Sequence, residues 1–429
     1  MNKCRRLLLG VALLGATGPL LAAPSRRRGT ALDAELAAIA ADPACELASL
    51  SVLAIRAGQI SYMYQCGRRF IGHDGLPDKP VGPDTLFRIA SISKMMTTLG
   101  LLRLYEDGHV NLDADVSGYL GFTLRNPHYP DQAITLRHLL THTSSLRDDA
   151  GYSWGADVAL KDVIDEKMFA ANAGPGAYFT YCNLGWGVIG TVMERVSGER
   201  FDRLMRRLLI EPLGLRAGYL PAELPPAALS NLATLYRKRT VDTEVWDPNG
   251  PWIAQADDYS VKPPPAIDRY VIGTNATPFS PTGGLRISAR DMGVVMRMLM
   301  GHGPRLLKPA TLDLMFSRQW TYDGRNGDTS DGLFRCWGLG NEQFPDAPGT
   351  RVADGGGFPA VGHLGDAYGL MSVFVFDPAR QNGMVVLVGG TSTDPFGPAN
   401  KGKYSPLARF QERILTALYR GAILPNNSA

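Results

Sequence analysis

The sequence is poor in cysteine and in clustered charge. Among its 429 residues there are five cysteines, and none of them form a CxxC pair, which argues against a zinc site of that type. The 44 basic and 41 acidic residues leave a net charge of +3, without the clustered basic face that nucleic-acid binding requires. We therefore expect no nucleic-acid partner.

Long apolar runs are absent beyond the N-terminus. A positively charged start precedes an apolar stretch over residues 7–21, and two small alanines follow it, which predicts a signal peptide over residues 1–23. The alternative is a membrane anchor, but the stretch is shorter than the ~20 residues that a span needs and is interrupted by glycine and proline. We expect a periplasmic or secreted protein with no stable membrane span after signal removal.

The sequence does not determine how the cysteines pair. Removal of the signal would take Cys4 with it and leave Cys45, Cys66, Cys182 and Cys336. Four thiols allow three pairings, and the sequence does not choose among them. A bridge between Cys45 and Cys66, which flank a predicted hairpin, is one alternative in an oxidising compartment, and four separate thiols are the other.

Apolar spacing and turn residues predict the secondary structure. Two β-rich runs joined by Ala57-Gly58-Gln59 predict a hairpin, and Pro-rich residues 220–280 predict a long connection of the kind that lines sites. The predicted strands are 51–56, 60–66, 369–376 and 384–389. The predicted helices are 31–42, 91–106, 135–141, 158–171, 184–196, 201–209, 289–300, 308–317 and 404–419.

Strands at both ends with helices between them predict an α/β (α+β) fold. It consists of an antiparallel sheet flanked by helices, with an inserted and mostly helical subdomain. We expect a single catalytic domain over residues 31–425, with its α/β part in 31–110 and 280–425 and its helical insertion in 111–279. The first hairpin and the late strands would then share one sheet.

A serine and a lysine one helical turn apart begin the helix predicted over 91–106. Ser91 and Lys94 have the spacing that places two side chains on the same helix face. If burial lowers the pKa of the lysine, its neutral amine can take the hydroxyl proton. The N–H groups at the helix N-terminus then favour an oxyanion. Taken alone this SxxK pattern is weak, and its alternative is a helix start with an exposed lysine.

Two further patterns offer partners for that pair. In Tyr181-Cys182-Asn183, a phenol can act as general acid or base, and an amide can both donate to and accept from a substrate. In His363-Leu364-Gly365, a glycine beside a histidine permits close approach of a ligand to the backbone. Taken singly, the first is as readily a helix cap by Asn183, and the second an ordinary turn histidine.

Together the three patterns resemble the serine β-lactamase and penicillin-binding protein superfamily. The similar branch contains class C β-lactamases, D-Ala-D-Ala carboxypeptidases, D-aminopeptidases and esterases. The segments Ile134–Leu146 and Thr282–Asp291 also fit, and the resemblance extends from about Ala31 to Tyr419. It implies a β-lactamase/transpeptidase-like fold and a small-molecule ester, β-lactam or peptidoglycan-like peptide as substrate.

The resemblance also implies a role for each matching residue. Ser91 would be the acylated nucleophile and Lys94 its base, while Tyr181 would protonate the leaving group or activate the deacylating water. Asn183 would bind the acyl side of the substrate. The backbone N–H groups of Ser91 and Asp366, next to His363 and Gly365, would form the oxyanion hole.

Two residues depart from the pattern of penicillin-recognising members. His363 stands where most of them have lysine, and Leu364 stands where a hydroxyl usually binds the carboxylate of the substrate. A leucine cannot donate that hydrogen bond. The prediction is therefore an exported serine hydrolase that acts on an ester or a D-amino-acid peptide or amide by acyl transfer, without metal or organic cofactor. The alternatives are a class C-type β-lactamase and a non-catalytic penicillin-binding or sensor domain.

Other patterns carry less weight. The glycines of residues 185–190 match GxGxxG, but no strand precedes them, which argues against a dinucleotide site. His138 and His142 have the spacing of a zinc helix without its glutamate, so core or capping roles are expected. Cys182 is expected to point away from its neighbours into packing. Three tryptophans in loop-like stretches are candidates to line a cleft: Trp154, Trp246 and Trp252.

Overall fold

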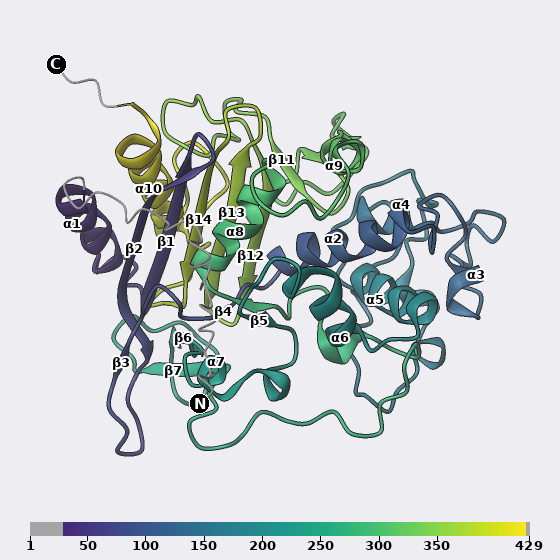
Figure 1. Cartoon of the computed structure of the whole chain (residues 1–429), viewed down its shortest axis with the longest axis horizontal. Helices are drawn as coiled ribbons and strands as arrows, with labels where there is room; N and C mark the ends of the chain where they lie inside the picture. The colour runs from purple at the N-terminus through teal and green to yellow at the C-terminus, as the bar shows by residue number, and fades with distance from the viewer. Residues whose placement is uncertain (1–28, 426–429) are drawn as a thin grey trace, which may run out of the picture.

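The computed structural model describes residues 29–425, and the expected signal peptide over 1–23 lies outside the described residues. The strands of its largest sheet are β1 (Ser49–Arg56), β2 (Gln59–Phe70), β3 (Lys79–Pro80), β9 (Trp320–Thr321), β10 (Cys336–Trp337), β11 (Glu342–Phe344), β12 (Ala360–Ala367), β13 (Leu370–Asp377) and β14 (Asn382–Val388). Their order across this antiparallel sheet is β3-β2-β1-β14-β13-β12-β11-β10-β9 (Figure 1).

The first hairpin and the late strands share this sheet, as the sequence predicts. β1 pairs with β2 on one side and with β14 on the other, so that Leu53 lies opposite both Met63 and Val385. Ala57 and Gly58, between β1 and β2, have φ angles of 46° and 73°. Two consecutive positive φ values are typical of the tight turn that matches the twist of a hairpin.

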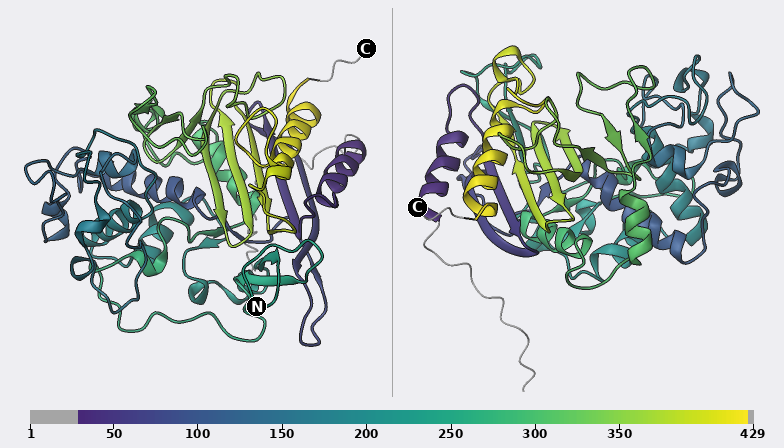
Figure 2. Two further views of the ribbon diagram at one scale, coloured as in Figure 1. Left: turned by 180° about the vertical axis from the view of Figure 1, so that it is seen from behind. Right: turned by 90° about the horizontal axis from the view of Figure 1, so that it is seen from above.

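Helices cover both faces of the sheet, as Figure 2 shows from above. The helices are α1 (Gly29–Ala40), α2 (Ile92–Glu106), α3 (Ser117–Leu120), α4 (Leu136–Leu140), α5 (Leu184–Ser197), α6 (Phe201–Met205), α7 (Pro226–Leu229), α8 (Ala289–Leu299), α9 (Pro309–Phe316) and α10 (Arg409–Leu418). Val52 and Val386 pack under α1 and α10, whereas Leu53 and Val385 face α2 and α8. Because successive side chains alternate between two covered faces, the central strands are almost continuously apolar.

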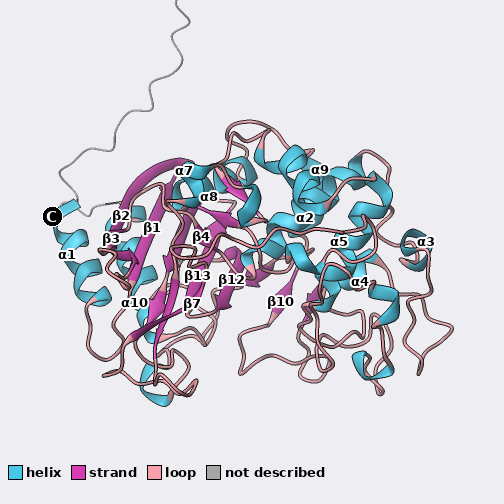
Figure 3. Cartoon of the chain, turned by 90° about the horizontal axis from the view of Figure 1, so that it is seen from below, coloured by secondary structure: helices cyan, strands magenta, loops and turns pink. Residues whose placement is uncertain are grey.

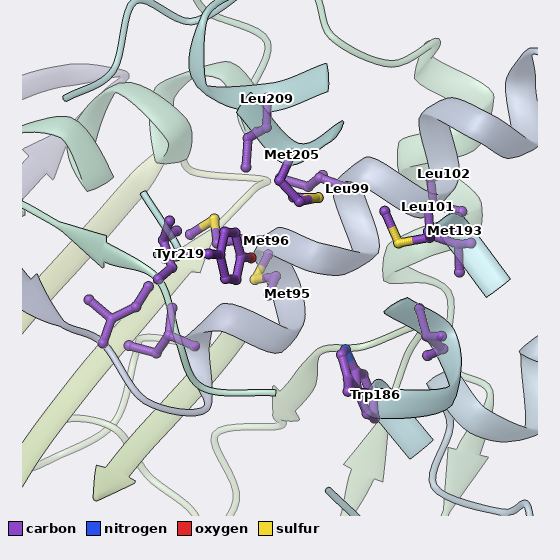
Figure 4. Packing of buried hydrophobic residues seen from close by; sticks show 14 of the residues in the cluster. Met95, Met96, Leu99, Leu101, Leu102, Trp186, Met193, Met205, Leu209 and Tyr219 are labelled. Carbon is purple, nitrogen blue, oxygen red and sulfur yellow. The ribbon is translucent and has the colours of Figure 1, made fainter. Parts of the chain in front are cut away.

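The helical region lies beside the sheet, and α2 extends from the sheet into it (Figure 3). α2 is buried on nearly every side, which explains why its sequence is apolar around most of its circumference. Figure 4 shows Met95, Met96 and Leu99 of this helix packed among side chains of neighbouring elements. This packing fixes the helix whose first turn carries the predicted nucleophile and base.

Two helix predictions are wrong in part. Residues 158–171 form only two separate single turns, Leu160–Asp162 and Glu166–Met168, because the Asp165 side chain accepts from the Lys167 N–H and starts a new turn. The final helix begins at Arg409 instead of residue 404. The preceding N–H groups, from Lys403 to Ser405, donate to the buried Glu412 carboxylate instead of forming helix bonds.

Two three-stranded sheets complete the fold. One has the order β4 (Phe87–Arg88), β8 (Arg286–Ile287), β5 (Ala217–Gly218), and the other β15 (Gly390–Thr391), β6 (Leu235–Lys238), β7 (Trp252–Ala256). No helix within residues 29–425 is long and apolar enough to cross a bilayer.

The four cysteines expected in the mature chain are free thiols. The Cys45–Cys66 bridge is therefore not formed, and the alternative of separate thiols holds. The strand register places Leu50, and not Cys45, opposite Cys66.

Candidate active site

Ser91 lies at a strained turn between a short strand and a long helix. It follows β4 and is the N-cap residue of α2, while Ala90 before it has a φ of 46°. That left-handed conformation is rare for a residue with a Cβ and persists only when its surroundings enforce it. Backbone hydrogen bonds from Ile89 N to Leu285 O and from Ser93 N to Ala90 O hold the turn.

Lys94 lies fully buried beneath Ser91. Its Nζ is 3.0 Å from Ser91 Oγ, 2.7 Å from Asn183 Oδ1 and 3.2 Å from the carbonyl oxygen of Thr282. Burial lowers the pKa of Lys94 to about 7, although the nearby Asp148 charge opposes this shift. Near neutral pH a large fraction of the amine is therefore uncharged, and an uncharged amine can accept the hydroxyl proton of Ser91.

The carbonyl of Thr282 reaches Lys94 because α5 permits close packing. Cβ atoms added at Gly187 and Gly190 would lie 2.7 Å from Thr277 and 2.6 Å from Pro281. These glycines, part of the GxGxxG-like pattern, thus let the segment before Thr282 lie against the helix. Their role is packing within this region of the fold.

Tyr181 is held between two rings. The Tyr181 ring stacks on His142 with 4.4 Å between the ring centroids, and on Phe334 with 5.1 Å. Lys94 Nζ lies 4.8 Å from the centroid of the Tyr181 ring. Burial raises the pKa of the Tyr181 phenol, and the interaction with Ser91 lowers it by less. The phenol therefore keeps its proton at ordinary pH and can donate it near Ser91.

Asn183 is oriented by Asp148, a residue that sequence reasoning missed. The Asp148 carboxylate accepts from the backbone N–H groups of Asn183 and Leu184 and from Asn183 Nδ2, all at 2.8–2.9 Å. This leaves Asn183 Oδ1 free to accept from Lys94 and from the Thr282 hydroxyl. The only signal in the sequence is that Asp148 follows closely after the family-like segment ending at Leu146.

Replacing Asp148 with alanine should destabilise the fold and weaken the site. We expect the free energy of unfolding to fall by about 2 kcal/mol or more, because three N–H groups at the N-terminus of α5 lose their acceptor. Urea denaturation measures this. Asp149→Ala is the matched control, since Asp149 is exposed and pairs only with Arg147, and it should change the free energy by less than about 0.5 kcal/mol. Equal effects of the two variants would contradict the assignment.

His363, Gly365 and Asp366 lie on β12, beside the nucleophile turn. His363 is buried, and its Nδ1 donates to the carbonyl of Leu364 at 2.6 Å, while its Nε2 has no partner among the described residues. Burial, with the Lys94 charge adding to it, lowers the pKa of His363 to about 3, so this ring is neutral. It cannot supply the positive charge that a lysine would place here.

Gly365 allows β12 to approach the serine turn. A Cβ at this position would lie 2.3 Å from Ser372 Oγ and 2.4 Å from the carbonyl oxygen of Ile89. Only glycine fits this gap, so the backbone of β12 runs directly against the turn that carries Ser91. The oxyanion role predicted for the N–H groups of Ser91 and Asp366 is compatible with this approach.

One cleft of about 1410 Å³ gathers these residues. Its wall includes six of the predicted site residues: Ser91, Tyr181, Asn183, His363, Gly365 and Asp366. Lys94 lies behind Ser91 and is not part of the wall. The long connection at 220–280 lines the cleft with Tyr259 and Ile267. The tryptophans suggested for this purpose, Trp154, Trp246 and Trp252, are not in the wall, which carries tyrosine and phenylalanine rings instead.

Three residues that the sequence analysis set aside from catalysis, His138, His142 and Cys182, have structural roles. His138 completes a capping box with Thr135 at the start of α4. His142 is buried and accepts from the Cys182 N–H at 2.9 Å, so both histidines have the core or capping roles expected. Cys182 points to Asp148, to which its buried thiol donates at 3.3 Å.

The comparisons with known proteins place this geometry in a family. A family model described as Beta-lactamase matches residues 36–404. The chain is 35% identical over 170 residues to "Esterase EstB" of Burkholderia gladioli. These matched residues cover 35% of this chain and 43% of that protein. It is 30% identical over 139 residues to the "D-alanyl-D-alanine-carboxypeptidase/endopeptidase AmpH" of Escherichia coli K12, covering 31% of this chain and 36% of that protein. Less than half the length of either relative is therefore matched.

A solved structure shows the same fold over nearly the whole chain. The D-amino acid amidase of Ochrobactrum anthropi SV3 superposes with a TM-score of 0.66 at 19% identity. The match covers 92% of this chain and 99% of the amidase. At this identity the match establishes the shared architecture alone.

Proposed function

Because this chain belongs to the β-lactamase family, we propose that it is an exported serine hydrolase that cleaves esters or D-amino-acid peptides and amides through an acyl-enzyme on Ser91. The observation that carries the proposal is the buried Lys94 amine, 3.0 Å from Ser91 Oγ and with a pKa of about 7. A nucleophilic serine needs an adjacent base of this kind.

The reaction proceeds in two acyl-transfer steps. Neutral Lys94 takes the Ser91 proton while Oγ bonds to the substrate carbonyl carbon, and the N–H groups of Ser91 and Asp366 stabilise the oxyanion. The carbonyl re-forms as the bond to the leaving group breaks, and Tyr181 gives that group a proton, which Lys94 then replaces. Water attacks the acyl-enzyme by the reverse route, and Ser91 recovers its proton as the acid leaves.

The substrate class rests on the relatives and on two residues of the cleft. The matched relatives include an esterase and a D-Ala-D-Ala carboxypeptidase/endopeptidase by name. The neutral His363 ring and the Leu364 side chain provide neither the charge nor the hydroxyl that would bind a β-lactam carboxylate. These features favour an ester or amide substrate over efficient β-lactam turnover.

Intact mass spectrometry tests the proposal. The mature protein is incubated with a fluorophosphonate and, separately, with a penicillin, and the Ser91→Ala variant is the control. We expect a fluorophosphonate adduct on the wild type and none on the variant. Absence of any adduct on the wild type would favour the non-catalytic alternative, whereas rapid turnover of the penicillin would favour the β-lactamase.

The pH dependence of acylation should follow the ionisation of Lys94. Protonated Lys94 cannot accept the serine proton, so the rate should be low in acid, rise as the pH passes through about 7, and level off above it. Single-turnover acylation by a neutral ester from about pH 5 to pH 9 measures this profile. A rate that falls as the pH rises through 7 would contradict a neutral lysine base.

Export is part of the proposal and rests on the pattern of residues 1–23. Expression of the full chain in a Gram-negative host, followed by fractionation and N-terminal sequencing, tests it. We expect a periplasmic or secreted protein that begins at Pro24. A protein that keeps Met1 in the cytoplasm would contradict export.

A further inference from the structure

Glu342 is a buried carboxyl group that the proposed mechanism does not use. It lies on β11, is 1% exposed and belongs to the wall of the same cleft as Ser91. Neither of its carboxyl oxygens has a hydrogen-bond partner among residues 29–425. Because nearly all buried polar groups in folded proteins are paired, a carboxyl without a protein partner in a substrate cleft is available to bind a ligand.

The strand register places Glu342 beside the predicted substrate-binding residues of β12. Glu342 lies opposite Gly362 of β12, and Gly362 directly precedes His363 and Leu364. A charge on Glu342 would also raise the pKa of Tyr181, so the carboxyl lies near enough to the phenol for their charges to interact. In the proposed reaction that phenol protonates the leaving group.

The neighbouring wall of the cleft is apolar. Leu333, Phe334 and Leu364 line the cleft together with Glu342, and Phe334 stacks on Tyr181. Burial in these surroundings raises the pKa of Glu342 well above its usual range. Burial that disfavours a negative charge on Glu342 also disfavours the carboxylate of a leaving group beside it.

A protonated amine suits these surroundings. Its N–H can form a charge-assisted hydrogen bond to Glu342, whose proton passes to solvent as the carboxylate forms. An aromatic ring such as that of Phe334 adds a face that attracts cations. The low dielectric strengthens the attraction between the two opposite charges.

We propose that Glu342 binds a protonated amine carried on the leaving group of the substrate. This rests on the proposed function, since it assigns the leaving-group side from the roles of Ser91 and Tyr181. It deepens that function by naming a substrate class: esters or amides whose departing alcohol or amine carries a further basic nitrogen.

A matched pair of thioesters tests the proposal. S-(2-dimethylaminoethyl) butanethioate carries the cation, and S-(3-methylbutyl) butanethioate has the same shape without it, and both release a thiol that a chromogenic disulfide detects. We expect wild-type kcat/KM to be at least about tenfold higher for the amine, the factor expected of one charge-assisted hydrogen bond. Equal values for the two thioesters would overturn the proposal.

Variants locate the effect. Glu342→Gln keeps the shape of the side chain and removes the acid that becomes a carboxylate when the amine binds. It should therefore erase most of the preference for the amine, measured as the ratio of kcat/KM for the two thioesters. Glu244→Gln is the matched control, because Glu244 lines the same cleft but is exposed, and it should preserve the preference. A preference that persists in Glu342→Gln would overturn the proposal.

A binding measurement on the wild type does not depend on folding of the variant or on catalysis. Calorimetric titration with 2-(dimethylamino)ethanol and with 3-methylbutan-1-ol should show at least about tenfold tighter binding of the amine. Equal affinities would refute the amine site. Failure of the proposed function is recognised separately, because the wild type would then not cleave the neutral thioester in a manner that depends on Ser91.

Discussion

Substitution of Lys94 by methionine is expected to slow acylation by about 10³–10⁴-fold. The buried Lys94 amine lies 3.0 Å from Ser91 Oγ, and methionine fills a similar volume without accepting a proton. The fold should persist, because the substitution replaces a fully buried amine by an apolar side chain and leaves the Thr282 hydroxyl bonded to Asn183. Single-turnover acylation by a p-nitrophenyl ester and thermal unfolding measure the two effects.

The control for this variant is Lys79→Met. Lys79 lies on the short edge strand β3, where it contacts the ring of Phe70 outside the cleft. Its substitution should leave acylation within about twofold of the wild type. If Lys94→Met retains activity within about tenfold of the wild type, another group is the base and the assignment is wrong.

Substitution of Tyr181 by phenylalanine should slow the cleavage of a substrate more strongly when its leaving group is poorer. The ring stack between His142 and Phe334 remains, and only the phenolic proton donor is lost. We expect the rate to fall by about 10² or more for an alkyl ester, whose alkoxide must be protonated to leave. For a p-nitrophenyl ester, whose leaving group departs as an anion, we expect a fall of about tenfold or less.

Steady-state kinetics on the two esters measure this difference. Tyr178→Phe is the matched control, since the Tyr178 hydroxyl bonds to Asp328 outside the cleft wall and its loss should affect both esters equally and little. A uniform loss on both esters in Tyr181→Phe would indicate a role in positioning, and would contradict proton donation to the leaving group.

Residues close together in the sequence were the most predictable part of the site. Ser91 and Lys94 are three residues apart, which on a helix places them one turn apart on the same face. The structure brings their reactive atoms within hydrogen-bond distance. The positions of Tyr181 and His363 relative to that pair came only from the family resemblance. No local pattern encodes a contact between residues that are about 90 or more positions apart in the chain.

Asp148 and Glu342 were not predicted because their roles depend on tertiary burial. Asp148 acts through three N–H groups at the start of α5, on Asn183 and Leu184, which lie 35 and 36 residues later in the chain. Glu342 is notable only because nothing pairs with it among the described residues, and a sequence does not reveal a missing partner. The helix expected over residues 158–171 was wrong for a related reason, since side-chain bonds to the backbone outweighed apolar spacing.

The central claim is that Ser91 becomes acylated during turnover, and peptide mapping of a trapped acyl-enzyme tests it most directly. Trypsin cleaves after Arg88 and Lys94, so residues 89–94 form one peptide that contains both Ser91 and Ser93. Ser93 is buried, and its hydroxyl accepts from the Leu285 N–H, so it should remain unmodified. After rapid acid quench of an ester reaction, we predict the acyl mass on Ser91, lost in Ser91→Ala and retained in Ser93→Ala. An acyl group on any other residue, or an adduct that persists in Ser91→Ala, would contradict the mechanism.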